Sequence, residues 1–163
     1  MTGRRRAAAT GLPTPAVILA RHRMPVSAGE LRAERRALAA YAVFRERHYE
    51  PYVQYAALRI GRHRAAELAV SAAFTELAVS WTAVLGSAGP AAVAWRILHD
   101  HIDDVLGLRP APAHASGGQM VRALQHDVYL LHQQIHMSRD RIAEVLGISP
   151  DQVSGLLQRS SKE

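Results

Sequence analysis

The chain has 163 residues, of which 48% are hydrophobic and 21% are charged, and its formal net charge is +6. This length suits one ordinary domain or two small helical ones, and the composition excludes a wholly disordered chain. No apolar run approaches the roughly 20 residues that a spanning helix needs, so we expect no membrane contact. The absence of cysteine excludes disulfides and thiolate chemistry and suits the cytoplasm, where we expect the protein to act.

The basic charge lies at the front of the chain. Residues 1–64 hold 13 Arg and 4 Glu, whereas residues 65–163 hold 7 basic and 10 acidic side chains. We predict that residues 1–26, which combine an arginine run with three prolines, form a flexible basic tail. The apolar run 16–20 is shorter than the roughly 7–15 residues of a secretory signal. The tail is either simply solvated or an arm that reaches nucleic-acid phosphates.

Helical periodicity dominates residues 27–106, which we predict to be a first helical domain. Ser27 and Glu30 form a capping box, and an apolar face follows at Leu31, Leu38, Tyr41 and Phe44. Pro51 is predicted to lie in the first turn of a second helix that ends near Gly61, because proline needs no backbone donor there. Third and fourth helices are expected at about 64–85 and 91–106.

Residues 107–118 are rich in Pro, Gly and Ala and interrupt the periodicity, so we predict a linker between two domains. The second domain, 119–163, is expected to contain three helices. The first spans about 119–134, Ser138 caps a short second helix, and Gly147 ends it. Ser149, Pro150 and Gln152 then open the last helix as cap, first residue and capping-box partner. The expected fold class is therefore all-α, with two small helical domains.

Residues 141–153 have the pattern of a helix-turn-helix. Ala143 is small where two helices cross closely, Gly147 supplies a left-handed turn, and Ile148 and Val153 hold the second helix against the first. In such a motif the second helix enters the DNA major groove. An ordinary helical hairpin is the alternative. The best DNA-facing residues are Arg139, Arg141, Gln152, Ser154, Gln158 and Arg159.

With this motif the chain resembles bacterial sigma factors of the extracytoplasmic-function group. The segments 127–131 and 142–149 resemble the family's C-terminal domain, which reads the −35 promoter element. Segments 44–49, 55–61 and 95–103, together with Phe74 and Trp81, resemble its N-terminal domain, which binds RNA polymerase and melts the −10 element. The resemblance covers about residues 40–160 and implies promoter DNA and RNA polymerase core as partners. Polymerase or another partner would then contact Leu68, Ser71, Phe74 and Leu156.

Two other functions remain open at this stage. DNA affinity comes mainly from basic side chains that neutralise phosphates. Residues 119–163, however, carry five basic and five acidic side chains, and residues 65–118 are net acidic, so neither part has the net positive charge that favours DNA binding. The chain is therefore either a sigma-like transcription regulator or a degenerate sigma-like module that binds a regulatory protein or a second copy. A dimeric helix-turn-helix regulator with little polymerase binding is the other alternative.

Polar clusters elsewhere in the chain give no convincing catalytic or metal site. His99 and Asp103 share a helix face, but a metal generally needs three or four converging ligands. His132 and His136 are better interpreted as side chains that satisfy helix-end carbonyls. No nucleophile–base pair, paired carboxylates or phosphate-binding glycine loop is recognisable, so we expect neither an enzyme nor a cofactor.

Overall fold

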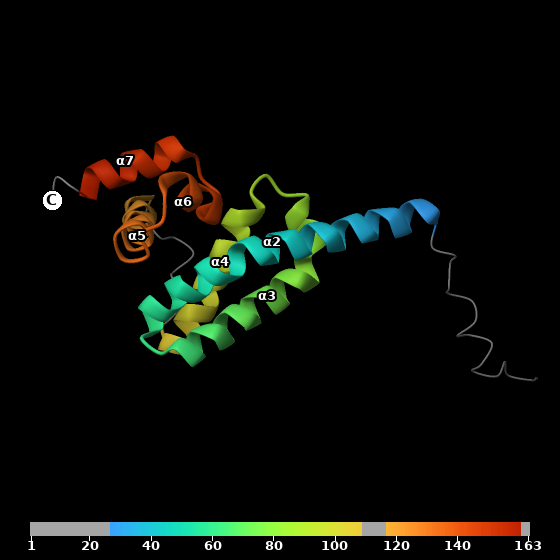
Figure 1. Ribbon diagram of the computed structural model, residues 1–163, viewed down its shortest axis with the longest axis horizontal. Helices are drawn as coiled ribbons and strands as arrows, with labels where there is room; N and C mark the ends of the chain where they lie inside the picture. Colours follow the sequence, from blue (N-terminus) through green and yellow to red (C-terminus); the bar gives the residue numbers. More distant parts are fainter. Residues whose placement is uncertain (1–26, 109–116, 161–163) are drawn as a thin grey trace, which may run out of the picture. The chain divides into compact units, whose positions relative to one another are not determined.

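The computed structural model describes residues 27–108 and 117–160, and this part of the chain contains helices and no strand (Figure 1). The all-α fold class is thus confirmed. The predicted tail 1–26 and most of the predicted linker lie outside the described residues. The elements are α2 (Ala28–Ile60), α3 (His63–Leu85), α4 (Pro90–Leu106), α5 (Gly117–Tyr129), the π-helix η1 (Leu130–Gln134), α6 (Arg139–Leu146) and α7 (Pro150–Ser160).

Backbone contacts divide the chain into compact units after Glu34, so that the helices from Arg35 onward belong to one unit. The core of this unit receives buried side chains from α2, α3 and α4 and also from α5, α6 and α7. The division does not fall in the segment 107–118. Whether residues 119–163 act as a separate domain stays a prediction.

Helix α2 begins as the sequence predicts but does not end at Pro51. The Ser27 backbone N–H donates to Glu30 Oε2 at 2.6 Å, and the Glu30 N–H donates to Ser27 Oγ at 3.1 Å, which completes the capping box. The predicted pair of helices is instead one helix with Pro51 inside it. Proline normally breaks a helix because it removes the hydrogen bond to the carbonyl four residues earlier.

The carbonyl that Pro51 leaves without its helical partner belongs to Arg47, four residues earlier, and it has another donor. The Arg141 Nη2 group of α6 donates a hydrogen bond to the Arg47 carbonyl oxygen. A guanidinium carries five N–H donors, so it can make this bond and still bind a carboxylate. Tertiary packing thus compensates for the proline, and α2 continues to Ile60.

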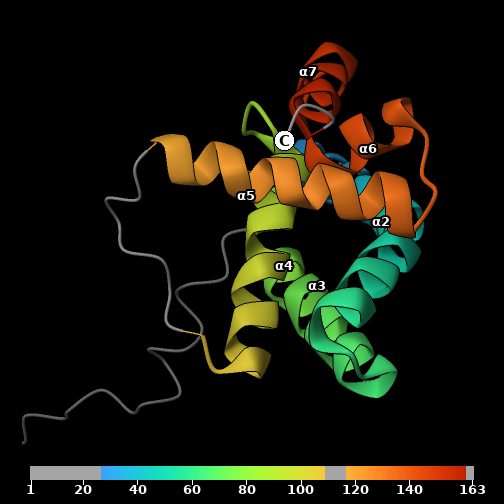
Figure 2. The same cartoon turned by 90° about the vertical axis from the view of Figure 1, so that its left-hand side faces the viewer.

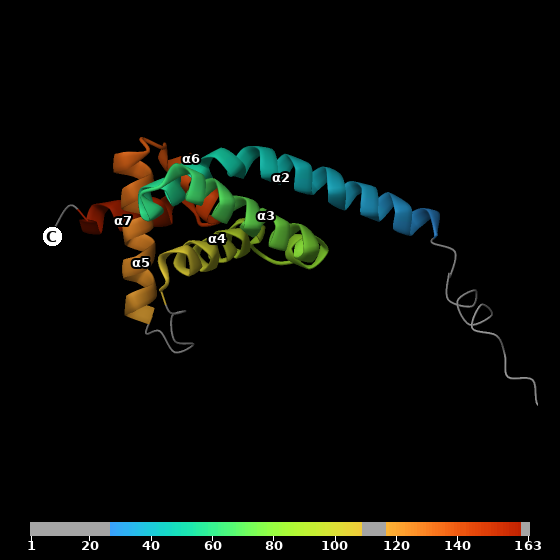
Figure 3. The ribbon, with the colours of Figure 1, turned by 90° about the horizontal axis from the view of Figure 1, so that it is seen from below.

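Helices α3 and α4 run side by side and pack against α2 (Figures 1 and 3). Aromatic side chains fill the space between them: Phe44 of α2 lies 5.2 Å from the Trp81 ring and Tyr52 lies 5.6 Å from the Phe74 ring, measured between ring centroids. The Trp81 indole N–H donates to the Ala37 carbonyl at 2.8 Å. The aromatic side chains of this part of α2 therefore belong mostly to the core.

Several large apolar side chains of the helices are exposed. Leu38 is 63% exposed, Leu68 is 64% exposed, and Val105 is 39% exposed. A period of 3.6 residues identifies an apolar stripe but does not say which part of it finds a neighbouring helix. Leu77, Trp81 and Val84 of α3, by contrast, are buried.

Helix α3 corrects the expectation that no segment could span a membrane. By length and composition alone it is long and apolar enough to cross one. Its apolar residues include Phe74, Leu77 and Trp81, which are each at most 5% exposed and lie in the core. Packing against α2 and α4 thus explains part of the apolar composition of α3, whereas Leu68 and Val79 of the same helix are 64% and 88% exposed.

Helix α5 crosses the ends of α2 and α4 and is joined to them by a buried polar network (Figure 2). At its centre is Asp127, which is 4% exposed. The Tyr55 hydroxyl donates to Asp127 Oδ1 at 2.5 Å, and the Trp95 indole N–H donates to Oδ2 at 3.2 Å. His99 Nε2 lies 3.1 Å from Oδ2. A buried carboxylate needs such partners, because its desolvation is costly.

The turn between α6 and α7 packs closely against the start of α4. Gly147 has a φ of 69°, and a Cβ added there would lie 2.5 Å from the Ala92 backbone nitrogen. There are therefore two reasons for glycine at this position: the backbone is left-handed, and the backbone of α4 approaches too closely for a side chain. The second reason depends on tertiary packing and is not visible in the sequence.

Candidate nucleic-acid interface

Helices α6 and α7 are connected by a short turn whose caps match the predicted residues. The Arg141 N–H donates to Ser138 Oγ at 3.3 Å, which caps α6, and the Ile148 N–H donates to the Ala143 carbonyl at 3.0 Å beyond the turn. The Ser149 N–H donates to Gln152 Oε1 at 2.9 Å, and the Gln152 N–H donates to Ser149 Oγ at 3.2 Å. These local predictions are confirmed.

The inner faces of α6 and α7 are apolar and buried. Ala143 is 4% exposed and Val153 is fully buried, which agrees with a close crossing of the two helices. Together with residues of α5 and η1 they form a common core, whose buried members are Val128, Leu131, Ile142, Ala143, Val145, Leu146, Val153 and Leu156. The packing fixes which side of α7 faces outward.

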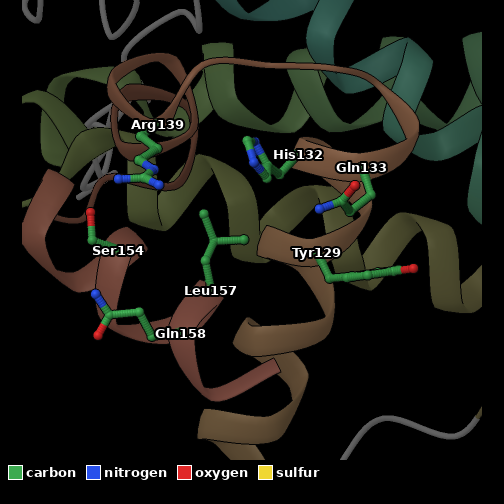
Figure 4. Close-up of a pocket in the computed structure, with 7 residues that line it drawn as sticks. All are labelled: Tyr129, His132, Gln133, Arg139, Ser154, Leu157 and Gln158. Carbon is green, nitrogen blue, oxygen red and sulfur yellow. The ribbon is translucent and has the colours of Figure 1, made fainter. Parts of the chain in front are cut away.

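On the outward side, α5, η1, α6 and α7 surround a hollow of about 220 Å³ (Figure 4). Figure 4 shows Arg139, Ser154 and Gln158 on one side of it and Tyr129 and Gln133 on the other. The remaining lining residues are His132 and Leu157. Side chains with hydrogen-bond donors and acceptors thus surround a concave surface that is open to solvent.

The structure brings three of the six predicted DNA-facing residues together in this hollow: Arg139, Ser154 and Gln158. Arg139 and Gln158 are exposed, whereas Ser154 is half-buried and its hydroxyl donates to the Pro150 carbonyl at 3.0 Å. Arg159 and Gln152 are also exposed but line a different depression, beside Leu124 of α5. The Gln152 side chain additionally holds the cap of α7.

Arg141 does not lie on this surface. Its guanidinium donates to Glu144 Oε2 at 2.6 Å and to the carbonyl of Arg47, so it joins α6 to α2. Arg47 Nε lies 2.6 Å from the other Glu144 oxygen. Although partial burial alone would raise the pKa of Glu144, hydrogen bonds from Arg141 and Arg47 hold it below its ordinary value. Arg141 is therefore interpreted as a structural residue.

The four predicted partner-binding residues separate into two exposed and two buried ones. Leu68 and Ser71 are exposed on α3. Phe74 is 2% exposed beneath the rings of α2, and Leu156 is 8% exposed against α5. A side chain that fills the core cannot also supply a contact surface, so Phe74 and Leu156 have packing roles in this structure.

Tyr129, His132 and Gln133 line the hollow but were not predicted from the sequence. They lie at the end of α5 and in η1, where the helix widens and the Ile135 N–H donates to the Leu130 carbonyl at 3.2 Å. His132 Nδ1 lies 3.1 Å from the carbonyl of Met137, which belongs to the turn before α6 and not to the end of η1, so its partner differs from the expected helix-end carbonyl. His136 has a φ of 58°, which turns the chain towards α6.

Exposed charges on the outer surface of α6 and α7 are balanced. Arg139 and Arg159 are accompanied by Asp140 and Asp151, all of which are exposed. Asp140 and Asp151 each lie in the first turn of their helix, where a carboxylate stabilises the helix dipole. Any nucleic-acid affinity of this surface would therefore depend on hydrogen bonds as much as on net charge.

Polar clusters in the rest of the described chain serve structural purposes. Arg59 of α2 donates to the Tyr55 hydroxyl at 2.8 Å and lies 3.8 Å from Asp103, which extends the network around Asp127. Burial, followed by the charge of Asp127, raises the pKa of Tyr55. Within residues 27–108 and 117–160, no three His, Asp or Glu side chains are grouped so that they could hold a metal ion.

A comparison of the chain with protein-family models, with curated proteins and with solved structures finds no match. The sigma-factor resemblance is therefore carried by the segments quoted from the sequence, and function is argued from the geometry of the α6–α7 surface.

Proposed function

We propose that this protein is a transcription regulator, similar in plan to a sigma factor, that binds promoter DNA through α7. The observation that carries the proposal is the capped α6–α7 hairpin, in which Gly147 is left-handed and Ala143 and Val153 are buried at the crossing. This combination gives the second helix a fixed outward face, which is what major-groove insertion requires.

The residues on that face divide into two roles. Gln158 and Ser154 carry neutral hydrogen-bonding groups suited to base edges, and an amide can make two bonds to adenine. Arg139, at the start of α6, and Arg159, near the end of α7, are suited to phosphates on either side of a groove. While its hydroxyl donates to the Pro150 carbonyl, Ser154 can only accept a hydrogen bond from a base, so Gln158, which can both donate and accept, is the stronger reader.

Selection from a pool of randomised DNA duplexes, followed by fluorescence anisotropy on the winning sequence, tests the proposal. We expect a preferred sequence to emerge. Gln158→Ala should reduce the binding free energy by about 1–3 kcal/mol and relax the base preference at one position of that sequence. Arg139→Ala should weaken all sequences equally and reduce the salt slope by about 1. Gln54→Ala and Arg96→Ala, which alter exposed residues of α2 and α4, serve as matched controls. Absence of any preferred sequence, with or without polymerase, would contradict the proposal.

RNA polymerase core is the proposed partner, and the exposed residues Leu68 and Ser71 of α3 supply the contact. Size-exclusion co-elution of the full chain with bacterial core polymerase at moderate salt measures it. We expect Leu68→Asp to abolish co-elution and Leu58→Asp, at a comparably exposed leucine of α2, to leave it unchanged. If both variants co-eluted with polymerase to the same extent, Leu68 would not be part of the polymerase contact.

Protein binding without DNA binding is the second candidate function, and the balanced charge of the α6–α7 surface favours it. The two functions differ in their response to salt. DNA affinity falls steeply as salt rises, because phosphate contacts release counterions, whereas an apolar protein contact persists. A complex that survives moderate salt, together with no DNA preference, would support this second function.

A further inference from the structure

Helices α2, α3, α4 and α6 enclose an apolar groove of about 530 Å³ that does not overlap the proposed DNA-binding surface. The aromatic rings of Phe44 and Trp81 lie in it, together with aliphatic side chains from all three longer helices: Ala39, Ala40, Val43, Leu85 and Pro90. Val43 is 57% exposed and Leu85 is 42% exposed. A volume of this size lies within the range of small-molecule sites, roughly 300–1,000 Å³.

The polar side chains of the groove are Arg47, His48 and Glu144. His48 offers no charge: its Nδ1 lies 2.8 Å from the Phe44 carbonyl, and burial lowers its pKa. Glu144 is already bound by Arg47 and Arg141. Two arginines thus face one carboxylate, which leaves an excess positive charge beside the apolar walls.

Arg47 is the group that can receive a ligand. Its side chain is 59% exposed, and its Nε lies 2.6 Å from Glu144 Oε1. A guanidinium carries five N–H donors, so Arg47 can bind Glu144 through its Nε and still present its Nη groups to a ligand. Because a guanidinium binds a carboxylate through two parallel N–H groups, these donors match an anionic head group.

We propose that this groove binds a small molecule that has an apolar body and one carboxylate, such as a medium-chain or aromatic carboxylic acid. The apolar body contacts Phe44, Trp81 and Val43, and the carboxylate contacts Arg47. Among the described residues that line the groove, only Arg47 and Glu144 are charged, which suits a single head group better than the repeated charges of an acidic partner helix.

Two matched pairs of probes test the site in the full chain. The first pair is 1-anilinonaphthalene-8-sulfonate and N-phenyl-1-naphthylamine, which share a ring system but differ in charge. We expect saturable one-site fluorescence binding of both, with the sulfonate bound more tightly. The second pair is octanoate and octanol, used as competitors. Octanoate should displace the sulfonate probe at a concentration at least tenfold lower than octanol, because only the carboxylate can use Arg47.

Variants place the binding in this groove. Val43→Asp, which puts a carboxylate among the apolar walls, should abolish binding of both probes, whereas Val79→Asp, at an 88% exposed valine of α3, should not. Arg47→Gln should weaken the sulfonate about tenfold and leave the neutral probe unchanged, with Arg45→Gln as its control. Circular dichroism verifies that each variant is folded.

Three results would overturn the proposal. The first is no saturable binding of either probe to the wild-type chain. The second is displacement of the sulfonate probe by octanoate and octanol at equal concentrations. This comparison uses the wild-type chain, so it remains valid even if Arg47→Gln does not fold. The third is equal binding by Val43→Asp and Val79→Asp. Binding of an acidic helical peptide in place of both probes would assign the groove to a protein partner instead.

Discussion

At the scale of single residues, Tyr52 and Tyr55 of α2 are equally buried but differ in what their hydroxyl groups meet. The Tyr55 hydroxyl donates to Asp127 and accepts from Arg59, whereas the Tyr52 hydroxyl has no partner among the described residues. We expect Tyr55→Phe to lower the free energy of unfolding by about 1–3 kcal/mol, because it leaves buried polar groups unsatisfied. Tyr52→Phe should leave it unchanged or raise it. Urea denaturation of both variants measures the difference, and equal destabilisation would contradict this account.

His48 gives the fold a pH dependence. Its pKa in the folded chain is lowered from 6.5, chiefly because burial disfavours the charged ring. As the pH falls below about 6.5, His48 is protonated in the unfolded chain but stays neutral in the folded chain. The free energy of unfolding therefore falls with decreasing pH. The slope is at most about 1.4 kcal/mol per pH unit.

Urea denaturation between pH 7.5 and 5 checks this expectation. His48→Gln should flatten the profile over that range, since a glutamine does not titrate. His126→Gln, at an exposed histidine of α5, should keep the wild-type slope. A wild-type slope in the His48 variant would show that another group dominates.

Residue roles could be predicted from the sequence only where the partner is close in the chain. Ser138, Ser149 and Gln152 act as predicted, because a cap depends on residues at most three positions away. Arg141 and Leu156 were expected on the surface, yet one binds α2 and the other packs against α5. Their partners are distant in the sequence, so no local pattern identifies them.

At the scale of elements, the long helix α2 depends on a contact with α6. Pro51 removes the backbone donor for the Arg47 carbonyl, and Arg141 supplies another. We expect Arg141→Met to lower the free energy of unfolding by about 2 kcal/mol in the wild type, because the carbonyl and Glu144 both lose a charged donor.

A double-mutant cycle with Pro51→Ala isolates the carbonyl contact. Alanine restores the helical N–H, so Arg141→Met should cost about 1 kcal/mol less in that background. Pro90→Ala, at the first position of α4 where no N–H is needed, is the control and should show no such coupling. Additive costs of Arg141→Met and Pro51→Ala would disprove the compensation.

Helix bounds were predicted well except where tertiary contacts override propensity. The third and fourth helices begin within one residue of their expected starts, since Gly86, Gly89 and Gly107 interrupt the pattern clearly. The break expected at Pro51 is absent, and the end of α5 becomes a π-helix that the periodicity does not reveal. This π-helix supplies His132 and Gln133, which are two of the four lining residues of the hollow that were not among the predicted DNA-facing residues.

At the scale of the whole molecule, the contacts from Arg35 onward predict cooperative unfolding. Asp127 of α5 holds Tyr55, Trp95 and His99, and Gly147 packs against the start of α4, so the C-terminal helices share a core with α2–α4. Both tryptophans, Trp81 and Trp95, lie in α3 and α4, whereas far-UV circular dichroism reports all helices. Thermal unfolding followed by fluorescence and by circular dichroism should therefore give coincident transitions.

Asp127→Ala extends this test, because it removes the acceptor at the centre of the shared network. We expect both signals to shift together by about 3 kcal/mol, which is roughly 6–12 °C for a chain of this size. Asp104→Ala, at an exposed acid of α4, should shift neither. A circular dichroism signal that splits into two steps would instead favour the separate domain predicted after residues 107–118. The α6–α7 surface would then bind DNA independently of α2–α4. The apolar groove would lose the wall that Glu144 of α6 provides when the C-terminal helices separate from α2.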